Sequence, residues 1–480
     1  MRNNIIGRKS EQDTLARIYE SKQSEFVAVC GRRRVGKTFL IREYFEEEMV
    51  FQTSGLAGAN TQEQLKNFFY TLRRYDKSVN TMPHDWLDAF ELLISYLESL
   101  DNVERKVVFL DELPWMDTPS SDFISALEHF WNGWASARRD IVLIVCGSAT
   151  SWMMDKLINN HGGLYGRLTH RLFLQPFSLA ESESFLKAKG MMLSRYEMAE
   201  VYMILGGIPY YLYLLDERLS VAQNIDRLLF NPNGELYNEF AILYRSLFKD
   251  SEAYVKVVEC LNERGYGMTR TEIAEAAKMK SGKTLTTILD NLESCGFIRK
   301  YVNYGCSTRK ALYQLVDFFT LFYFRFLRNS SFKNLLSWSK LQRTPRFYAW
   351  AGISFEILSM NHIDQIKQKL GISGVATSLY SWRSKGGERT DDSRLESTEK
   401  RAAQIDMVIE RGDNTINLCE MKFSEGEFDI TKDYEKVLRN KISRFMEETK
   451  TRKSIQLTFV TSYGLHRNMY SGIAQNEVIL

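Results

Sequence analysis

Residues 31–38 combine a glycine-rich turn with a lysine and a hydroxyl, the chemistry needed to hold a chain of phosphates. They read Gly-Arg-Arg-Arg-Val-Gly-Lys-Thr and fit the spacing G-x-x-x-x-G-K-[ST]. In such a loop the backbone N–H groups turn towards phosphate oxygens, Lys37 reaches the β- and γ-phosphates, and the Thr38 hydroxyl binds Mg²⁺. The candidate nucleotide-binding residues of the loop are Gly31, Arg32, Arg33, Arg34, Val35, Gly36, Lys37 and Thr38.

Two carboxylates, Asp111 and Glu112, follow the apolar run 107–110 and are candidates for the second half of the same site. A buried strand ends in acids when its carboxyl end faces a ligand, as it does in open α/β sheets. We expect Asp111 to hold Mg²⁺, directly or through water, and Glu112 to orient and deprotonate the attacking water. The pattern therefore predicts ATP and Mg²⁺ as cofactors and ATP hydrolysis as the reaction.

Two further candidates lie downstream of these acids. The strand-like run 141–146 is closely followed by Ser148, which can contact the γ-phosphate or the attacking water as a nucleotide sensor. A plain strand-to-loop turn explains Ser148 equally well. An arginine near the γ-phosphate would stabilise charge in the transition state, and we favour Arg167 over Arg171 for this catalytic role. A solvated or lid-pairing arginine is the alternative.

The carboxyl-terminal part holds a second group of reactive side chains, Asp406, Glu420 and Lys422. Glu420 and Lys422 lie two positions apart in one strand pattern, so they project from the same face. Asp406 on the preceding strand can join them, and Glu356 in an upstream helical pattern could add a carboxylate. With Asp406 and Glu420 as metal ligands, the group suits Mg²⁺ binding and water activation for phosphodiester cleavage. The same pattern is common on solvated sheet faces, so a purely structural role is the alternative.

Ordered elements must position these side chains. Residues 1–175 alternate strand-like apolar runs with helical periodicity, which is typical of a parallel sheet covered by helices on both faces. The run 26–30 predicts the strand before the phosphate loop, and 39–45 predicts the helix after it. Residues 176–245 are helical in pattern and predict a lid.

Residues 250–328 predict a separate module, with two helices around a turn and then a β-hairpin. This order is typical of a winged helix. The candidate contacts to DNA phosphates are Lys280, Lys283, Thr284, Arg309 and Lys310. A winged helix used only for packing or protein contact is an equally good interpretation.

The first half of the chain resembles the archaeal-type ATPases, which are AAA-like proteins related to the signalling ATPases with numerous domains. The resemblance covers residues 1–245 and is carried by Ile5–Glu11, Gly31–Thr38, Leu110–Glu112, Gly147–Ser148, Gly166–Arg167 and Gly206–Pro209. It implies that Gly7 and Arg8 begin a segment on the adenine side of the nucleotide. It also implies that Pro209 lies in a helical lid near the nucleotide.

Residues 335–480 resemble the restriction-endonuclease-like PD-(D/E)XK fold through Asp406 and the Glu420-Met421-Lys422 segment. They also resemble carboxyl-terminal domains of unknown function that are appended to archaeal-type ATPases. The resemblance implies a metal-dependent nuclease site, or an inactive relic of one.

Composition agrees with several domains built around apolar cores, since 44% of the 480 residues are hydrophobic and 13% are aromatic. No apolar run approaches the roughly 18 residues needed to cross a bilayer, so we expect no membrane association. The six cysteines include no C-x-x-C pair, so neither a zinc site nor a disulfide framework is indicated. Free thiols beside an ATP site predict a cytoplasmic protein. The formal charge of +3 neither demands nor excludes nucleic acid.

The sequence thus predicts an α/β protein: a P-loop NTPase parallel sheet with a helical lid, then a winged helix, then a restriction-endonuclease-like α/β domain. The corresponding boundaries are 1–175, 176–245, 250–328 and 335–480. We expect an ATP-hydrolysing switch that binds double-stranded DNA and carries a Mg²⁺-dependent nuclease-like domain, acting in DNA processing or defence as a possible homo-oligomer. The alternative is an ATP-driven signalling or scaffold protein whose nuclease-like domain is inactive.

Overall fold

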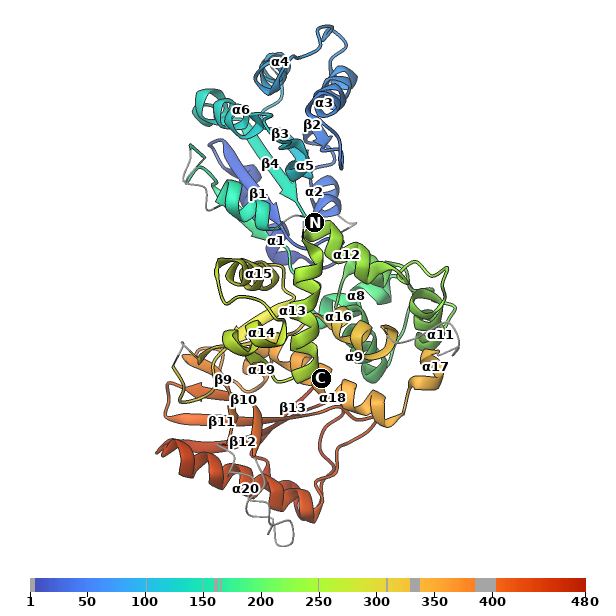
Figure 1. Cartoon of the computed structure of the whole chain (residues 1–480), viewed down its shortest axis with the longest axis vertical. Coiled ribbons are helices and arrows are strands. Elements are labelled where there is room, and N and C mark those ends of the chain that lie inside the picture. The colour runs from blue at the N-terminus through green and yellow to red at the C-terminus, as the bar shows by residue number, and fades with distance from the viewer. Residues whose placement is uncertain are drawn as a thin grey trace. The chain divides into compact units, whose positions relative to one another are not determined.

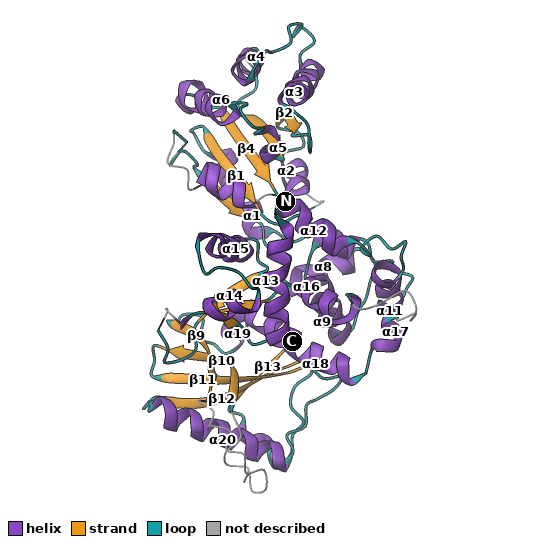
Figure 2. Cartoon of the chain, viewed as in Figure 1, coloured by secondary structure: helices purple, strands orange, loops and turns teal. Residues whose placement is uncertain are grey.

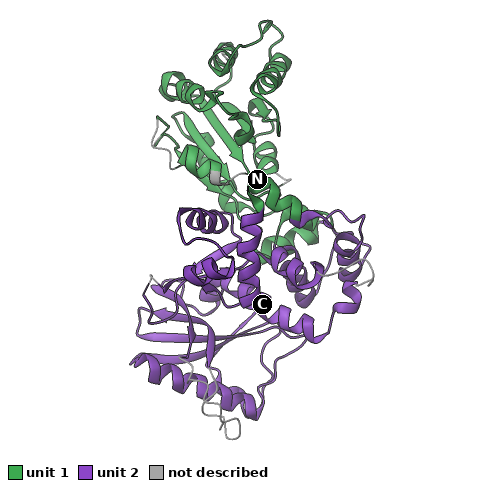
Figure 3. Cartoon of the chain, viewed as in Figure 1, with its two compact units in different colours: residues 1–188, 207–214, 241–251 green, residues 189–206, 215–240, 252–480 purple. Residues whose placement is uncertain are grey.

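The computed structural model describes residues 5–480 except 101, 149, 159–162, 165, 249, 308–309, 329–336 and 385–402. The chain forms two compact units (Figure 3). Unit 1 comprises residues 1–188, 207–214 and 241–251, and unit 2 comprises the remainder. The four boundaries expected from the sequence divide the chain more finely and stay a prediction. Within the described residues, no helix is both long enough and apolar enough to span a membrane.

Unit 1 is built on a parallel five-stranded sheet with the order β2-β3-β4-β1-β5 (Figures 1 and 2). Its strands are β1 Glu25–Cys30, β2 Met49–Ser54, β3 Lys106–Asp111, β4 Ile141–Gly147 and β5 His170–Phe173. Every residue of β1, β3 and β4 is buried, because helices cover both faces of a parallel sheet and leave no polar face. The parallel sheet expected from the sequence is confirmed.

Helices connect these strands and supply much of the core of unit 1. They are α1 Lys9–Glu20, α2 Lys37–Tyr44, α3 Thr61–Tyr75, α4 Trp86–Glu98, α5 Leu113–Met116, α6 Phe123–His129, α7 Thr150–Met153, α8 Leu179–Ala188 and α10 Pro209–Tyr213. Short π or 3-10 turns occupy Phe130–Trp134, Ala135–Ala137 and Met154–Ile158. Aromatic rings from α4 and α6 pack together in this core, with Trp86 and Phe123 centroids 4.8 Å apart. Such edge-on contacts add to the stability that area burial provides.

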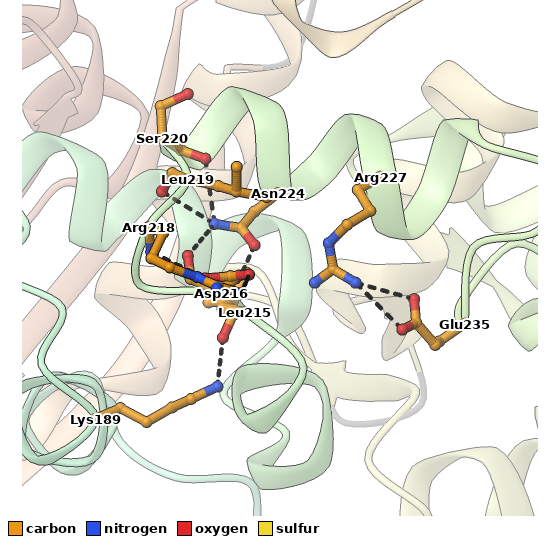
Figure 4. A network of polar contacts seen from close by, with 9 residues as sticks. All are labelled: Lys189, Leu215, Asp216, Arg218, Leu219, Ser220, Asn224, Arg227 and Glu235. Carbon is orange, nitrogen blue, oxygen red and sulfur yellow. Dashed lines mark hydrogen bonds and ion pairs between the residues drawn. The ribbon is translucent and has the colours of Figure 1, made fainter.

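Unit 2 begins with a helical region that includes α9 Arg195–Leu205, α11 Val221–Ile225 and a π-helical turn at Asp226–Phe230. Asn224 is fully buried and fixes the loop before α11 (Figure 4). Its Nδ2 donates to the carbonyls of Asp216 and Ser220 at 2.9 and 3.2 Å, and its Oδ1 accepts from the Asp216 N–H at 2.7 Å. A buried amide that satisfies several backbone groups in this way sets one loop conformation.

A small helical module with a three-stranded antiparallel sheet follows in unit 2. Its helices are α13 Ser251–Arg264, α14 Arg270–Ala276 and α15 Lys283–Ser294. Its strands are β6 Met268–Thr269, β7 Ile298–Tyr301 and β8 Leu312–Leu315, in the order β6-β8-β7. Thr269 and Glu272 form a capping box at the start of α14. Further helical segments lie between this module and the last sheet: α16 Phe318–Phe322, Tyr323–Leu327, α17 Trp338–Leu341, α18 Pro345–Asn361 and α19 Ile363–Lys369. Helix α12, Glu239–Leu247, precedes the module, and its residues from 241 onwards belong to unit 1.

The last part of unit 2 is a mixed five-stranded sheet with the order β13-β12-β11-β10-β9. The strands are β9 Thr377–Arg383, β10 Gln404–Arg411, β11 Thr415–Lys422, β12 Ser454–Thr461 and β13 Asn476–Ile479. Helix α20, Lys432–Thr449, connects β11 to the parallel strand β12, and a 3-10 turn at Ser471–Ile473 precedes β13. The long connection is needed because parallel neighbours cannot be joined by a tight turn.

Candidate functional sites

The phosphate loop lies between β1 and α2, at the carboxyl edge of the sheet in unit 1. Gly36 has a φ of 90° and forms the N-cap of α2, a left-handed conformation that favours glycine. Gly31 has a φ of 150°, and a Cβ there would lie 2.6 Å from the carbonyl oxygen of Leu174. The backbone conformation at Gly36 and the close contact at Gly31 therefore explain why both positions are glycine. The loop leads directly into the N-terminus of α2, which is suited to binding an anion.

Lys37 is 5% exposed and turns back over the loop. Its Nζ donates to the carbonyl oxygens of Gly31 and Arg32 at 2.9 and 3.1 Å and to Ser148 Oγ at 3.1 Å. A buried ammonium needs such acceptors. The lysine is thus held at the mouth of the loop by groups that phosphate oxygens can replace.

The acids of β3 meet the loop at the same edge. Thr38 Oγ1 donates to Asp111 Oδ2 at 2.8 Å. Ser148 Oγ donates to Glu112 Oε1 at 2.7 Å, and the Ser148 N–H lies 3.4 Å from Glu112 Oε2. Lys37 also donates to Ser148, and the backbone N–H of Glu112 donates to Asp111 Oδ1 at 2.9 Å, so hydrogen bonds connect all five residues. The structure brings together Lys37, Thr38, Asp111, Glu112 and Ser148 as the strand-end argument expects.

Two arginines, one of them within the loop, connect the phosphate loop to neighbouring segments of unit 1. Arg8 is 5% exposed, and its Nη2 donates to the Val35 carbonyl at 3.0 Å. The Arg34 guanidinium lies 4.5 Å from the ring centroid of Tyr210, in the helix that Pro209 begins. The segments that the resemblance assigned to the adenine side and the lid thus lie beside the loop within unit 1.

The two arginine candidates lie at different positions along the strands of the sheet. Arg167 is exposed, two residues before Thr169, whose N–H donates to the Phe26 carbonyl near the start of β1. Arg167 therefore lies at the amino ends of the strands, and the structure does not bring it to the phosphate loop. Arg171 lies within β5 opposite Ala28. Cys30 is the last residue of β1 before the phosphate loop. Burial raises the pKa of its thiol to about 12, and the charges of Lys37 and Arg171 oppose this rise. Arg171 is therefore nearer to the loop than Arg167 is.

A second group of ionisable side chains lies on the sheet of unit 2. Met407 of β10 pairs with Cys419 of β11 in an antiparallel register, so Asp406 and Glu420 are opposite neighbours one step further along. Like charges in opposite positions repel each other. Burial, and then the charge of Glu420, raise the pKa of Asp406 to about 6. Glu356 on α18 is close enough to be affected by the same carboxylates. Its burial, and then the charge of Asp406, raise its pKa to about 8.

Cations and a phenol surround Glu420, which is 1% exposed. Lys441 Nζ lies 2.5 Å from Oε1, Lys422 Nζ lies 3.5 Å from Oε2, and the Tyr434 hydroxyl donates to Oε2 at 3.0 Å. The structure therefore brings Asp406, Glu420 and Lys422 together. Within the ranges that the structure describes, no group of three or more His, Cys, Asp or Glu side chains is arranged to hold a metal ion.

Sequence reasoning missed Lys441 and Tyr434, which both lie on α20. Leu438 and Phe445 of this helix are buried in the sheet core, and Tyr434 and Lys441 share their helical spacing. A lysine at a core position of an amphipathic helix is a signal of a buried acid partner.

The module at 251–315 presents several of the expected basic residues. Lys280, Lys283 and Thr284, at the start of α15, are exposed, and so is Lys310 between β7 and β8. Arg309 lies outside the described residues. The positions allow contact with an anionic partner but do not identify one.

Residues 6–215 match a family model described as an ATPase domain predominantly from Archaea. The matched residues, which make up less than half of the chain, are similar to an archaeal-type P-loop ATPase domain. The structure is similar to that of a Walker-type ATPase of Pyrococcus abyssi, with a TM-score of 0.52 and 20% sequence identity. The similar region covers 67% of this chain and 96% of that one, and it shows a shared fold. An uncharacterised protein of Methanocaldococcus jannaschii, MJECL04, is 26% identical over 326 residues, which are 67% of this chain and 69% of that protein.

Proposed function

We propose that the protein binds ATP with Mg²⁺ at the phosphate loop and hydrolyses it. The observation that carries this proposal is that Lys37, Thr38, Asp111, Glu112 and Ser148 meet at one sheet edge, where side-chain bonds and the backbone N–H of Glu112 connect them. The Thr38 hydroxyl and the Asp111 carboxylate, 2.8 Å apart, are oxygen ligands of the kind Mg²⁺ prefers. Bound Mg²⁺ would neutralise charge on the β- and γ-phosphates.

The remaining steps fall to side chains of the loop and the acidic strand. Phosphate oxygens would replace the carbonyls that now accept from Lys37, so its charge would move to the phosphate chain. If Lys37 also left Ser148, the serine hydroxyl would keep only its bond to Glu112 and could adjust the position of that carboxylate. Glu112 would then orient the attacking water and accept its proton.

We further propose that ATP turnover controls a DNA-binding winged helix and a nuclease-like domain. The order of elements at 251–315 and the exposed Lys280 and Lys283 support contact with double-stranded DNA. The approach of Asp406, Glu420 and Lys422 supports a site for phosphodiester cleavage. The two carboxylates would hold Mg²⁺, and Lys422 would position water or phosphate.

The decisive experiment incubates the purified full chain with plasmid and linear DNA, with Mg²⁺ or Mn²⁺, and with or without ATP. We expect cleavage in wild type, loss of cleavage but normal ATP turnover in Asp406→Ala and Glu420→Ala, and slower cleavage in Lys422→Ala. Glu427→Ala is the matched control, because that carboxylate is 60% exposed and pairs with His466. No cleavage by wild type under any of these conditions rejects the nuclease proposal and leaves the ATPase proposal intact.

The alternative is an ATP-driven signalling or scaffold protein with an inactive nuclease-like domain. Lys441, Lys422 and Tyr434 favour it, because they already neutralise and hydrogen-bond Glu420. Equal Mn²⁺ binding by wild type and by the double Asp406→Ala, Glu420→Ala variant, measured calorimetrically, would support this alternative.

A further inference from the structure

A pocket of about 460 Å³ lies in unit 2, apart from the residues proposed for cleavage. That volume falls in the range of small-molecule sites. Its walls come from α9, the start of α11, the segment from α17 to α18 and the turn after β11. Tyr196, Val221 and Phe347 supply apolar surface, and Glu197, Glu200 and Glu425 supply carboxylates.

Glu200 is the deepest polar group of this pocket, with 2% of its surface exposed. Its Oε1 accepts from Trp338 Nε1 at 2.8 Å and from Gln342 Nε2 at 2.6 Å. Its Oε2 has no hydrogen-bond partner among the residues that the structure describes. This oxygen is not one of the fully buried side-chain atoms that lack a partner, so it is open to the pocket and available to a donor or a cation.

No cation of the described pocket lining pairs with Glu200. Burial raises the pKa of Glu200, the hydrogen bonds from Gln342 and Trp338 oppose this rise, and the charges of Glu197 and Glu425 add to it. The cation of the lining, Arg343, is 75% exposed and pairs instead with Glu425, with Nε 3.1 Å from Oε1. The pocket therefore offers negative potential and an unused acceptor at its base.

The walls of the pocket are fixed by bonds of their own. Asn224 sets the loop that ends at Ser220, and so sets the Ser220–Ala222 wall (Figure 4). Asp226 accepts from the backbone N–H of Trp338 and from the Ser339 hydroxyl, which ties α17 to the turn after α11. On another wall, the Tyr196 ring stacks on Phe423 at 4.3 Å. A pocket built on fixed walls loses little entropy when it binds.

We propose that this pocket binds an organic cation, an ammonium or guanidinium group on an alkyl stem. The cation donates to Glu200 Oε2 and is drawn in by Glu197 and Glu425. The stem lies between Tyr196 and Phe347, whose rings suit both an alkyl chain and a cation. A free amine and a lysine or arginine side chain of a polypeptide share this chemistry.

Titration calorimetry on the full chain tests the proposal with two probes, agmatine and a capped Gly-Arg-Gly peptide. We expect saturable binding of at least one probe and none of 1-pentanol, which lacks the charge. Binding of agmatine alone assigns the pocket to free amines, and binding of the peptide alone assigns it to polypeptide side chains. Glu200→Gln keeps the acceptor for Trp338 and Gln342 and should weaken binding about tenfold or more.

Glu427→Gln, an exposed carboxylate outside the pocket, is the matched control and should bind as wild type does. If Glu200→Gln does not fold, Glu425→Gln removes a pocket charge from a side chain that is 44% exposed, and should still weaken binding measurably. The proposal is overturned if neither probe binds wild type, or if binding survives unchanged in the pocket variant that folds.

Discussion

At the scale of single residues, the phosphate loop is held by bonds that a triphosphate would replace. Lys37 satisfies its charge on two loop carbonyls and on Ser148, and Glu112 is held by the same serine. Under the proposed function, ATP binding and hydrolysis would depend on different members of this group, and single substitutions should separate them.

We expect Lys37→Ala to abolish ATP turnover by removing the phosphate contact, and Glu112→Gln to retain ATP binding while slowing hydrolysis. Loss of an activating base costs about 10²–10⁴ in rate. Phosphate release and fluorescent nucleotide binding, measured side by side, check both expectations. Normal turnover by the Glu112→Gln protein would contradict the role given to this carboxylate.

The residues of the phosphate site could be predicted because their signals are local. Gly31–Thr38 is contiguous, and Asp111 ends an apolar run, so strand order alone brings them together. The partners of Glu420 could not be found this way. Lys441 lies 21 residues further on, and the packing of α20 on the sheet decides which acid it meets. The pocket around Glu200 could not be predicted from the sequence either, because four separate segments of the chain form its walls.

At the scale of elements, charged side chains pin the amino ends of the central strands. Lys106 at the start of β3 lies 2.6 Å from Asp140, and Arg138 Nη2 lies 2.7 Å from the same carboxylate, just before β4. Lys106 is 4% exposed. These bonds hold the pKa of Asp140 well below its ordinary value, with Arg138 as the main cause and Lys106 next.

Asp140→Asn should therefore lower the free energy of unfolding by about 1–3 kcal/mol at pH 7, because charged hydrogen bonds are lost. The folded-state pKa of Asp140 is depressed, so its contribution is present above pH 4 and declines as the pH falls below that value. Urea unfolding at pH 7 and pH 3 should show a smaller difference at pH 3. Glu183→Gln, which breaks the exposed pair with Lys187, should cost less than about 1 kcal/mol. An unchanged difference at pH 3 would argue against the ion pair.

At the scale of the whole molecule, the position of Arg167 bears on assembly. It is exposed and lies at the strand ends opposite the phosphate loop of its own chain. A catalytic arginine in that place can act only on the nucleotide of a second copy. Arg171 lies further along the sheet, opposite Ala28 of β1, and is nearer to the phosphate loop of its own chain.

We expect Arg167→Ala to slow turnover by about 10³-fold or more if it stabilises the departing phosphate, while ATP binding stays normal. Mixing Arg167→Ala with Lys37→Ala protein should restore part of the rate, because each copy supplies what the other lacks. Turnover is measured across a concentration series of the mixture. Full activity of Arg167→Ala alone would transfer the role to Arg171 or to no arginine.

The winged-helix proposal also makes a whole-molecule prediction. Four phosphate contacts predict a log–log salt slope of about −3 to −4 for binding to duplex DNA. Lys283→Ala should flatten that slope by about one and weaken two unrelated duplexes alike. Lys369→Ala, which removes an exposed cation from α19, should leave the slope unchanged. No binding by wild type at low salt would assign the module to packing.

The backbone conformation at Glu112 lowers the thermal stability of the protein at a residue with a proposed catalytic role. Its φ of 47° and ψ of 46° are left-handed, which costs a residue with a Cβ roughly 1–2 kcal/mol. Glu112→Gly and Glu112→Ala lose the same carboxylate, yet the glycine variant should unfold at the higher temperature, as calorimetry can test. Under the proposed function, the glutamate would be retained for its carboxylate, at a cost in thermal stability that a glycine would avoid.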